Sequence, residues 1–345
     1  MEGVKRLTKT KNPKLTRYKN IIKGRIFEFI LSDLIKRAGF LLNPDTPQLT
    51  KFGKKKKLHG RGGTYAADFI AEFPMTIPFS YPFLLLGEAK YYKKPLGIKE
   101  VRSFLGAFID VSQYVRINTK SRSLFKYSQI FLDKRYTYIP VIFSSGGFVK
   151  NAQALMWTHG IYFVSYENSP VIDKIRKKIE NLINKINFKA INQKEINKIK
   201  SIDDLSSLNS TVKKENFDKV LEELKNLINP IKTYFGILDG TWPIHFLSNL
   251  KREIKPATKI KECSFIRKEN SLIIKRTTHK NSTKWGSITL PRYFINEYEK
   301  MAKKKGKQIL NELILFIPKE NKVYPYYIRL KEIKNETTQN HLQTN

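Results

Sequence analysis

Apolar residues recur at helical spacing in several stretches of this chain. Residues 21–38 carry an apolar side chain at nearly every third or fourth position, which predicts a helix with one buried face. Glu28 lies on the flank of that face, where a carboxylate without a partner would be costly to bury. The same spacing predicts further helices over residues 97–114, 171–188 and 217–228.

Two strands are expected on either side of a bend that contains three prolines. Residues 68–72 alternate apolar and other side chains, and residues 84–90 begin with an apolar run. Proline cannot sit in a central strand, so the chain must turn between them. A turn midway between the two strands places Asp68 opposite Glu88. The two-residue period of a strand then places Glu88 and Lys90 on one face.

Two carboxylates beside a lysine are the side chains that metal-dependent phosphodiester hydrolysis requires. Carboxylates supply hard oxygen ligands to Mg²⁺, which acidifies a bound water and neutralises charge on the phosphate. A lysine beside them can hold the attacking water. An isolated Glu-x-Lys tripeptide most often marks a solvated strand edge. Here the tripeptide ends an apolar strand and has an aspartate at mirror spacing, which favours the catalytic interpretation.

The remaining apolar runs complete the expected fold. Strand-like runs at 138–143 and 161–165 enclose a helical segment at 152–158, an order that suits parallel strands joined by a right-handed crossover. We therefore expect an α/β fold with a mixed sheet flanked by helices. A smaller C-terminal α+β domain is expected from short strand-like runs at 271–276, 285–290, 312–317 and 323–330.

Changes in composition suggest the domain boundaries. Residues 189–212 are polar, and residues 236–330 interleave aromatic side chains with lysine and arginine, as surfaces that stack nucleic-acid bases do. A small core with a basic surface would give the same composition. The expected parts are a catalytic domain with a basic N-terminal arm at 1–188, a helical linker at 189–235, a DNA-recognition domain at 236–333 and a disordered tail at 334–345.

Short motifs in the first half of the chain resemble a known family. Gly24-Arg25-Ile26-Phe27-Glu28, Asp68 and Glu88-Ala89-Lys90 resemble the PD-(D/E)xK nuclease superfamily in their order and element type. His59-Gly60-Arg61-Gly62-Gly63 and the segment 142–148 resemble Mrr-like restriction endonuclease domains. The similarity covers residues 20–170. Two features depart from the family pattern: Ala67 precedes Asp68 where proline is frequent, and the helix after Lys90 lacks a glutamine found in some relatives.

The resemblance implies a restriction-endonuclease-like sheet and a set of roles. Asp68, Glu88 and Ala89 would hold Mg²⁺, with Mn²⁺ as a substitute, Lys90 would hold the attacking water, and Glu28 would lie nearby. The implied activity is a magnesium-dependent DNA endonuclease in a restriction or defence system. A double-strand break needs two active sites, so a homodimer is compatible with this activity.

Charge supports a polyanionic partner. The 345 residues contain 65 Lys and Arg against 30 Asp and Glu, a net charge of +35 that favours contact with nucleic acid. Runs of charge are usually solvated, but several basic residues lie next to the expected catalytic hairpin. The expected DNA-binding residues are Lys54, Lys55, Lys56, Lys57, Arg61, Lys93, Lys94 and Arg102.

Other residue patterns narrow the function. A single cysteine excludes a disulfide scaffold, and five scattered histidines argue against a histidine–metal nuclease. No phosphate-binding loop and no long apolar segment is present, so we expect a cytoplasmic protein with no membrane partner that does not power its own motion along DNA. Two alternatives stay open. One is a structure-selective junction nuclease, and the other is a non-catalytic basic nucleic-acid-binding protein.

Overall fold

The computed structural model describes residues 13–44, 49–52, 55–75, 79–113, 136–188, 191–206, 214–240, 242–248, 262–266, 271–277, 282–289, 296, 300, 312–319 and 322–329. The chain forms two compact units, Met1–Ile30 with Lys174–Asn229, and Leu31–Asp173 with Pro230–Asn345. These units do not coincide with the expected boundaries at 188 and 235, because each combines segments far apart in the sequence. The start of the N-terminal arm and the tail at 334–345 lie outside the described residues.

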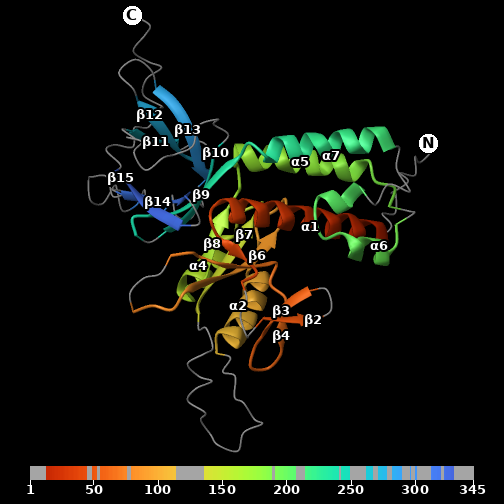
Figure 1. The fold of residues 1–345 in the computed structure, drawn as a ribbon, viewed down its shortest axis with the longest axis horizontal. Helices are drawn as coiled ribbons and strands as arrows, with labels where there is room; N and C mark the ends of the chain where they lie inside the picture. Colours follow the sequence, from red (N-terminus) through yellow and green to blue (C-terminus); the bar gives the residue numbers. More distant parts are fainter. Residues whose placement is uncertain are drawn as a thin grey trace, which may run out of the picture. The chain divides into compact units, whose positions relative to one another are not determined.

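The first unit is helical. It contains most of α1 (Pro13–Arg37) and α5 (Pro170–Asn184), together with α6 (Gln193–Lys198) and α7 (Lys214–Ile228). The helices α5 and α7 run side by side (Figure 1), and Lys178 on α5 pairs with Glu223 on α7. The expected helices are confirmed, although α5 ends before residue 188. Their apolar stripes are fully buried, at Ile22, Ile26, Ile175, Ile179, Leu182, Phe217 and Leu224.

The second unit contains a mixed five-stranded sheet with the order β1-β5-β6-β7-β8. The pairs β1–β5 and β5–β6 are antiparallel, and β6–β7 and β7–β8 are parallel. The expected α/β fold, including the parallel crossover, is therefore confirmed. The strands are β1 (Leu41–Leu42), β5 (Phe69–Glu72), β6 (Phe83–Lys90), β7 (Thr137–Ser144) and β8 (Tyr162–Ser165).

Two helices cover one face of this sheet. They are α2 (Ile98–Ser112) and α4 (Lys150–Thr158). Val101 of α2 and Met156 of α4 share a buried apolar cluster with Ile142 of β7. Towards the other end of α2, Val111 packs with Leu84 and Leu86 of β6. The side chains of β6 that follow Leu86 at two-residue spacing therefore face α2 as well.

A small antiparallel sheet lies in the stretch that the sequence marked only as a run of lysines. It consists of β2 (Leu49–Phe52), β3 (Lys55–His59) and β4 (Thr64–Tyr65). Leu58 on β3 is buried and contributes to the cluster around Leu84 and Leu86. The lysine run is thus part of a strand whose apolar end is anchored in the core.

The C-terminal part forms an antiparallel seven-stranded sheet with the order β11-β12-β13-β10-β9-β14-β15. The strands expected near 271–276, 285–290, 312–317 and 323–330 are present, and three further strands were missed. The bounds are β9 (Lys232–Leu238), β10 (Trp242–Ser248), β11 (Glu262–Ile266), β12 (Ser271–Thr277), β13 (Ser282–Thr289), β14 (Glu312–Lys319) and β15 (Lys322–Arg329).

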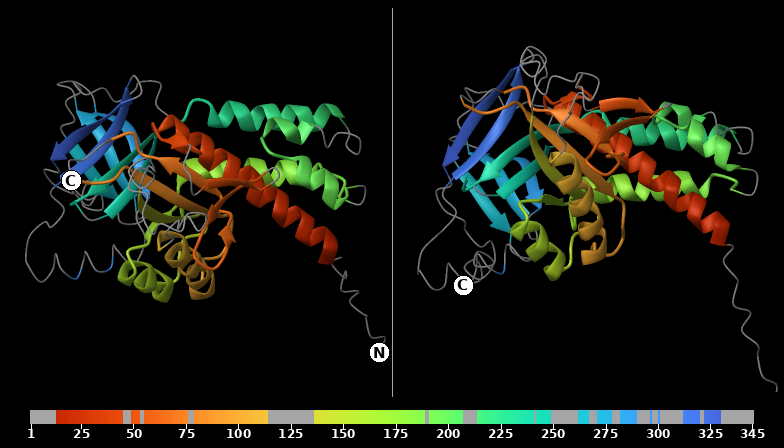
Figure 2. Two further views of the ribbon diagram at one scale, coloured as in Figure 1. Left: turned by 60° about the horizontal axis from the view of Figure 1, so that its bottom comes forward. Right: turned by 90° about the horizontal axis from the view of Figure 1, so that it is seen from below.

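The two large sheets belong to the same compact unit and meet through β8, β9 and β10 (Figure 2). The buried imidazole of His245 on β10 is hydrogen-bonded to Tyr166, which directly follows β8, and to Thr233 on β9. The ring of Phe235 stacks on the same imidazole at 4.4 Å. The C-terminal sheet is therefore joined to the first sheet by a continuous aromatic core.

Candidate active site

The register of the β5–β6 hairpin brings the predicted carboxylates together. Phe69 pairs with Gly87, and the backbone N–H of Asp68 donates to the carbonyl of Gly87 at 3.1 Å. Continuing the same antiparallel register by one residue places Asp68 opposite Glu88. The mirror arrangement expected from the sequence is confirmed.

The side chain of Asp68 is fixed by the opposite strand. Its Oδ2 accepts a hydrogen bond from the backbone N–H of Ala89 at 2.7 Å. Ala89 is buried, whereas Glu88 and Lys90 on the other face of β6 keep 20% and 25% of their side chains exposed. The strand thus presents its two ionic side chains on one face, as the two-residue period predicted.

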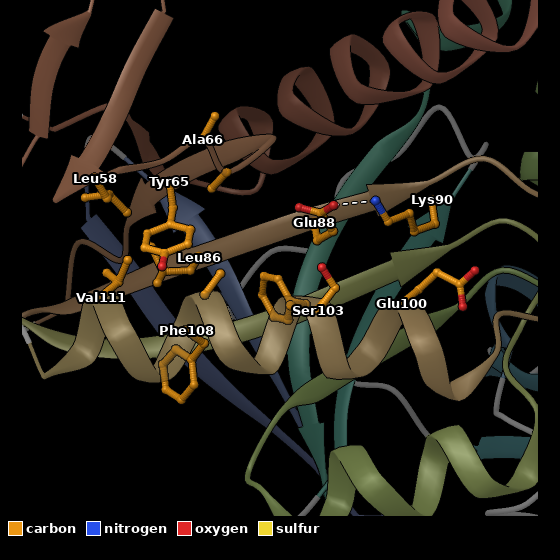
Figure 3. A pocket seen from close by; sticks show the side chains of 13 residues that line it. Leu58, Tyr65, Ala66, Leu86, Glu88, Lys90, Glu100, Ser103, Phe108 and Val111 are labelled. Atoms are coloured by element: carbon orange, nitrogen blue, oxygen red, sulfur yellow. Dashed lines mark hydrogen bonds and ion pairs between the residues drawn. The ribbon is translucent and has the colours of Figure 1, made fainter. Parts of the chain in front are cut away.

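Glu88 and Lys90 form an ion pair at the end of β6 (Figure 3). Burial lowers the pKa of Lys90, but the charge and hydrogen bond of Glu88, followed by the charge of Asp68, outweigh this effect. The pKa of Lys90 therefore lies above the ordinary lysine value. The ammonium keeps its proton at neutral pH and stands beside the two carboxylates as a fixed positive charge.

The end of β6 is supported by the turn that follows β7. The backbone N–H of Ser145 donates to the carbonyl of Lys90 at 3.0 Å, and its hydroxyl donates to the carbonyl of Tyr92 at 2.9 Å. A Cβ on Gly146 would lie 2.5 Å from the carbonyl oxygen of Tyr92, so only glycine fits there. Gly146 and Gly147 are buried in this turn. Their role is to hold the segment after Lys90.

A cavity of about 270 Å³ opens beside the ion pair, between β6 and α2 (Figure 3). Its polar end is formed by Glu88 and Lys90 together with Glu100 and Ser103 of α2. Glu100 and Ser103 are site residues that the sequence did not indicate. The helical period placed them on the polar flank of α2, but it could not show that this flank faces Glu88.

A loop between β3 and β4 is clamped to the far end of α2. The carboxylate of Asp110 accepts the backbone N–H of Gly62 at 2.9 Å and 3.1 Å through its two oxygens, and the Asp110 carbonyl accepts that of Arg61. A Cβ on Gly60 would lie 2.1 Å from Oδ2 of Asp110, which explains the glycine there. The glycine-rich motif was a sequence signal for this loop, but nothing marked Asp110 as its partner.

The predicted DNA-binding residues form two groups. Arg61, Lys93, Lys94 and Arg102 are exposed on segments that flank the cavity walls, in the loop before β4, the loop after β6 and helix α2. Lys55, Lys56 and Lys57 lie on β3, and Lys57 is half-buried. The side chains of Lys55 and Lys56, and the whole of Lys54, lie outside the described part of the chain.

Glu28 lies on α1 in the helical unit and is half-buried, whereas Asp68, Glu88 and Lys90 belong to the other unit. Its side chain thus occupies the flank of the buried stripe, as expected. The proposed place of Glu28 near the metal stays a prediction.

The residues at the strand ends fit a hard divalent cation with few protein ligands. Within the described part of the chain, no group of three or more His, Cys, Asp and Glu side chains lies where it could hold a metal ion. Asp68 and Glu88 supply two carboxylates at facing register positions, and Mg²⁺ commonly uses one or two carboxylates with water and substrate oxygens. Ala89 could add only its backbone carbonyl oxygen, because neither its methyl side chain nor its amide N–H offers a lone pair to a metal ion.

Comparison with known proteins gives little further guidance. No family model matches this chain, and no curated protein matches it. A solved structure, described as a protein of unknown function, AF1548, aligns over 59% of this chain and 98% of its own length. The identity is 16% and the TM-score 0.34, and a similarity at this level carries no argument about function.

Among the helices that the structure describes, none combines the length and the apolar character needed to cross a membrane.

Proposed function

We propose that this protein is a metal-dependent DNA endonuclease of the PD-(D/E)xK type, acting in restriction or defence. The observation that carries the proposal is the meeting of Asp68, Glu88 and Lys90 at the paired ends of β5 and β6, beside a cavity. The net charge of +35 supports a polyanionic substrate. The mixed sheet flanked by helices is the fold that the resemblance implied.

Each side chain of the cluster has a defined part in this proposal. Asp68 and Glu88 would hold Mg²⁺, or Mn²⁺ in its place, and the ion would acidify water and neutralise charge on the scissile phosphate. The N–H of Ala89 keeps the Asp68 carboxylate oriented. Lys90, protonated beside Glu88, positions the attacking water and stabilises the charge that develops on the phosphate oxygens.

The test compares cleavage by the full chain with cleavage by single-residue variants of the cluster. Circular and linear duplex DNA is incubated with Mg²⁺, Mn²⁺ or a chelator. We expect metal-dependent cutting by the wild type and a loss of about a hundredfold or more for Asp68→Asn, Glu88→Gln and Lys90→Ala, since each removes a charge that acts on the transition state. Glu222→Gln, an exposed glutamate on α7, is the matched control and should cut normally.

DNA binding separates this function from the non-catalytic alternative. In chelator, the Asp68→Asn and Glu88→Gln proteins should bind DNA at least as tightly as the wild type, because negative charge facing the phosphates is removed. Metal-independent or undiminished cutting by Glu88→Gln would refute the assignment. Tight binding without any cutting by the wild type would favour a non-catalytic nucleic-acid-binding protein.

A further inference from the structure

The cavity beside the ion pair has two chemically different ends. Glu88 and Lys90 close one end, where the proposed chemistry takes place. The other end is lined by the aromatic ring of Tyr65 and by the aliphatic side chains of Leu58, Leu86 and Val111 (Figure 3). All of these residues lie on β3, β4, β6 and α2 within one compact unit. An ionic end joined to an aromatic end matches the two halves of a nucleotide, a charged phosphate and a planar base.

The ring of Tyr65, the aromatic wall of the cavity, is held in place by Asp110 of α2. The Tyr65 hydroxyl is hydrogen-bonded to Asp110, and this bond is the largest of the effects that raise the pKa of Tyr65. Asp110 also holds the backbone of Gly62, so the ring and the loop before it share one anchor. Fixing a ring beforehand reduces the entropy that is lost when a ligand stacks on it.

We propose that this cavity receives the base of an unpaired nucleotide next to the scissile phosphate, so that the enzyme prefers DNA with an unpaired base at the cutting site. The inference rests on the proposed nuclease function and names its substrate class. A paired base would first have to leave the helix stack, which costs free energy, whereas an unpaired base enters without that cost. Stacking on aromatic rings tolerates any base, so the preference is for structure rather than for sequence.

The cavity is continuous with the ion pair, and its size and lining favour a nucleotide base as its occupant. A cavity of this volume is near the lower end of the range used for small ligands, which suits one base rather than a larger group. Lys90 offers its charge at one end only, and Leu58, Leu86 and Val111 leave the far end apolar. A charged group at the far end would lose its water without gaining a partner of opposite charge, which is costly, whereas an uncharged flat heterocycle does not carry that cost.

The experiment measures binding to three DNA duplexes in chelator, where no cutting occurs. One duplex is fully paired, one carries a single extra unpaired nucleotide, and one carries an extra abasic residue at the same position. Fluorescence anisotropy of the full-length wild type should show about tenfold tighter binding to the unpaired nucleotide than to the other two, within the range expected for one base stacked on aromatic rings. The abasic duplex controls for bending of the backbone.

Two filling variants assign the effect to the cavity. Ala107→Leu extends a side chain into it from α2, and Ala66→Leu does so from the opposite wall at an exposed position that tolerates the change if the first variant fails to fold. Gly106→Leu is the matched control, because Gly106 is exposed and a Cβ there meets nothing within 4 Å. The filling variants should lose the tenfold preference and keep the affinity for paired DNA, whereas Gly106→Leu should retain both.

The outcomes separate this inference from the function on which it rests. Metal-dependent cutting with equal binding to all three duplexes would overturn the inference and leave the nuclease assignment standing. A preference that persists in both filling variants would also overturn it. A preference lost on filling, in a protein that never cuts DNA, would support the base site and refute the nuclease.

Discussion

At the scale of single residues, Gly87 makes room for an aromatic ring across the catalytic hairpin. A Cβ at this position would lie 1.8 Å from Cε2 of Phe69, inside the ring that packs across the hairpin. Phe69 and Gly87 form the register pair next to Asp68 and Glu88. The absence of a side chain at Gly87 therefore leaves room for the ring of Phe69 on the face of the hairpin opposite to Glu88 and Lys90.

We predict that Gly87→Ala destabilises the protein by about 1–3 kcal/mol, because the ring of Phe69 must move to admit the methyl group. Urea denaturation followed by tryptophan fluorescence measures this change. Gly106→Ala is the paired control, since the new methyl group meets open space and alanine is about 1 kcal/mol better than glycine in a helix. Equal effects of the two substitutions would contradict the packing account.

At the scale of elements, His245 connects strands of the two large sheets. Both ring nitrogens are engaged, with the hydroxyls of Tyr166 and Thr233, and the ring stacks on Phe235. Burial, followed by the charge of Arg37, lowers the pKa of His245 to about 3. The imidazole is therefore neutral in the folded protein, and its protonation would break a contact between β8, β9 and β10.

This contact predicts how stability depends on pH. The unfolded chain protonates His245 near pH 6.5, whereas the folded protein does so only near the pKa of about 3, so stability falls as pH drops through this range. Between pH 7.5 and 5.5 the free energy of unfolding should decrease by about 1.4 kcal/mol from this residue. Urea titrations at both values measure it.

The matched variant for this prediction is His245→Phe, which keeps a ring against Phe235 and removes the titrating group. Its stability should be less dependent on pH than that of the wild type, whatever its absolute value. If both proteins lose the same free energy between pH 7.5 and 5.5, His245 is not the source of the dependence.

At the scale of the whole molecule, charge controls the encounter with DNA. The chain has 65 basic and 30 acidic residues, and the resulting positive charge attracts phosphates. Each phosphate contact then releases counterions. Arg61, Lys93, Lys94 and Arg102 are exposed, so their charges are available for such contacts. Affinity should therefore depend steeply on salt.

With ~6–10 phosphate contacts, we predict that affinity for duplex DNA falls by roughly 10³–10⁵ between 50 and 200 mM salt. Replacing Lys54, Lys55, Lys56 and Lys57 by glutamine should flatten the plot of log affinity against log salt. The control replaces four exposed lysines of the helical unit, Lys174, Lys177, Lys185 and Lys219, with the same change in net charge. Equal slopes for both variants would show that Lys54 to Lys57 make no specific phosphate contacts.

The sequence by itself determined the helices α1, α2, α4, α5 and α7 and the β5–β6 hairpin with its register. The buried positions of α1 are those of the apolar period, and Asp68 faces Glu88 because a two-residue period and a proline-broken turn leave one consistent pairing. These features depend on neighbours close in the chain, so periodicity is enough to predict them. The strands β9 and β10 were missed because Gly236 and Pro243 interrupt their patterns, and packing overrides such local signals.

Only the tertiary structure decided which distant residues share a site. Asp110 lies 48 positions from Gly62, and Tyr166 lies 79 positions from His245, so no local period relates them. The cavity arises where α2 faces the end of β6, and its aromatic wall comes from a third element, β4. A period specifies which face of an element is apolar, whereas the partner of that face is set by the way the elements pack together.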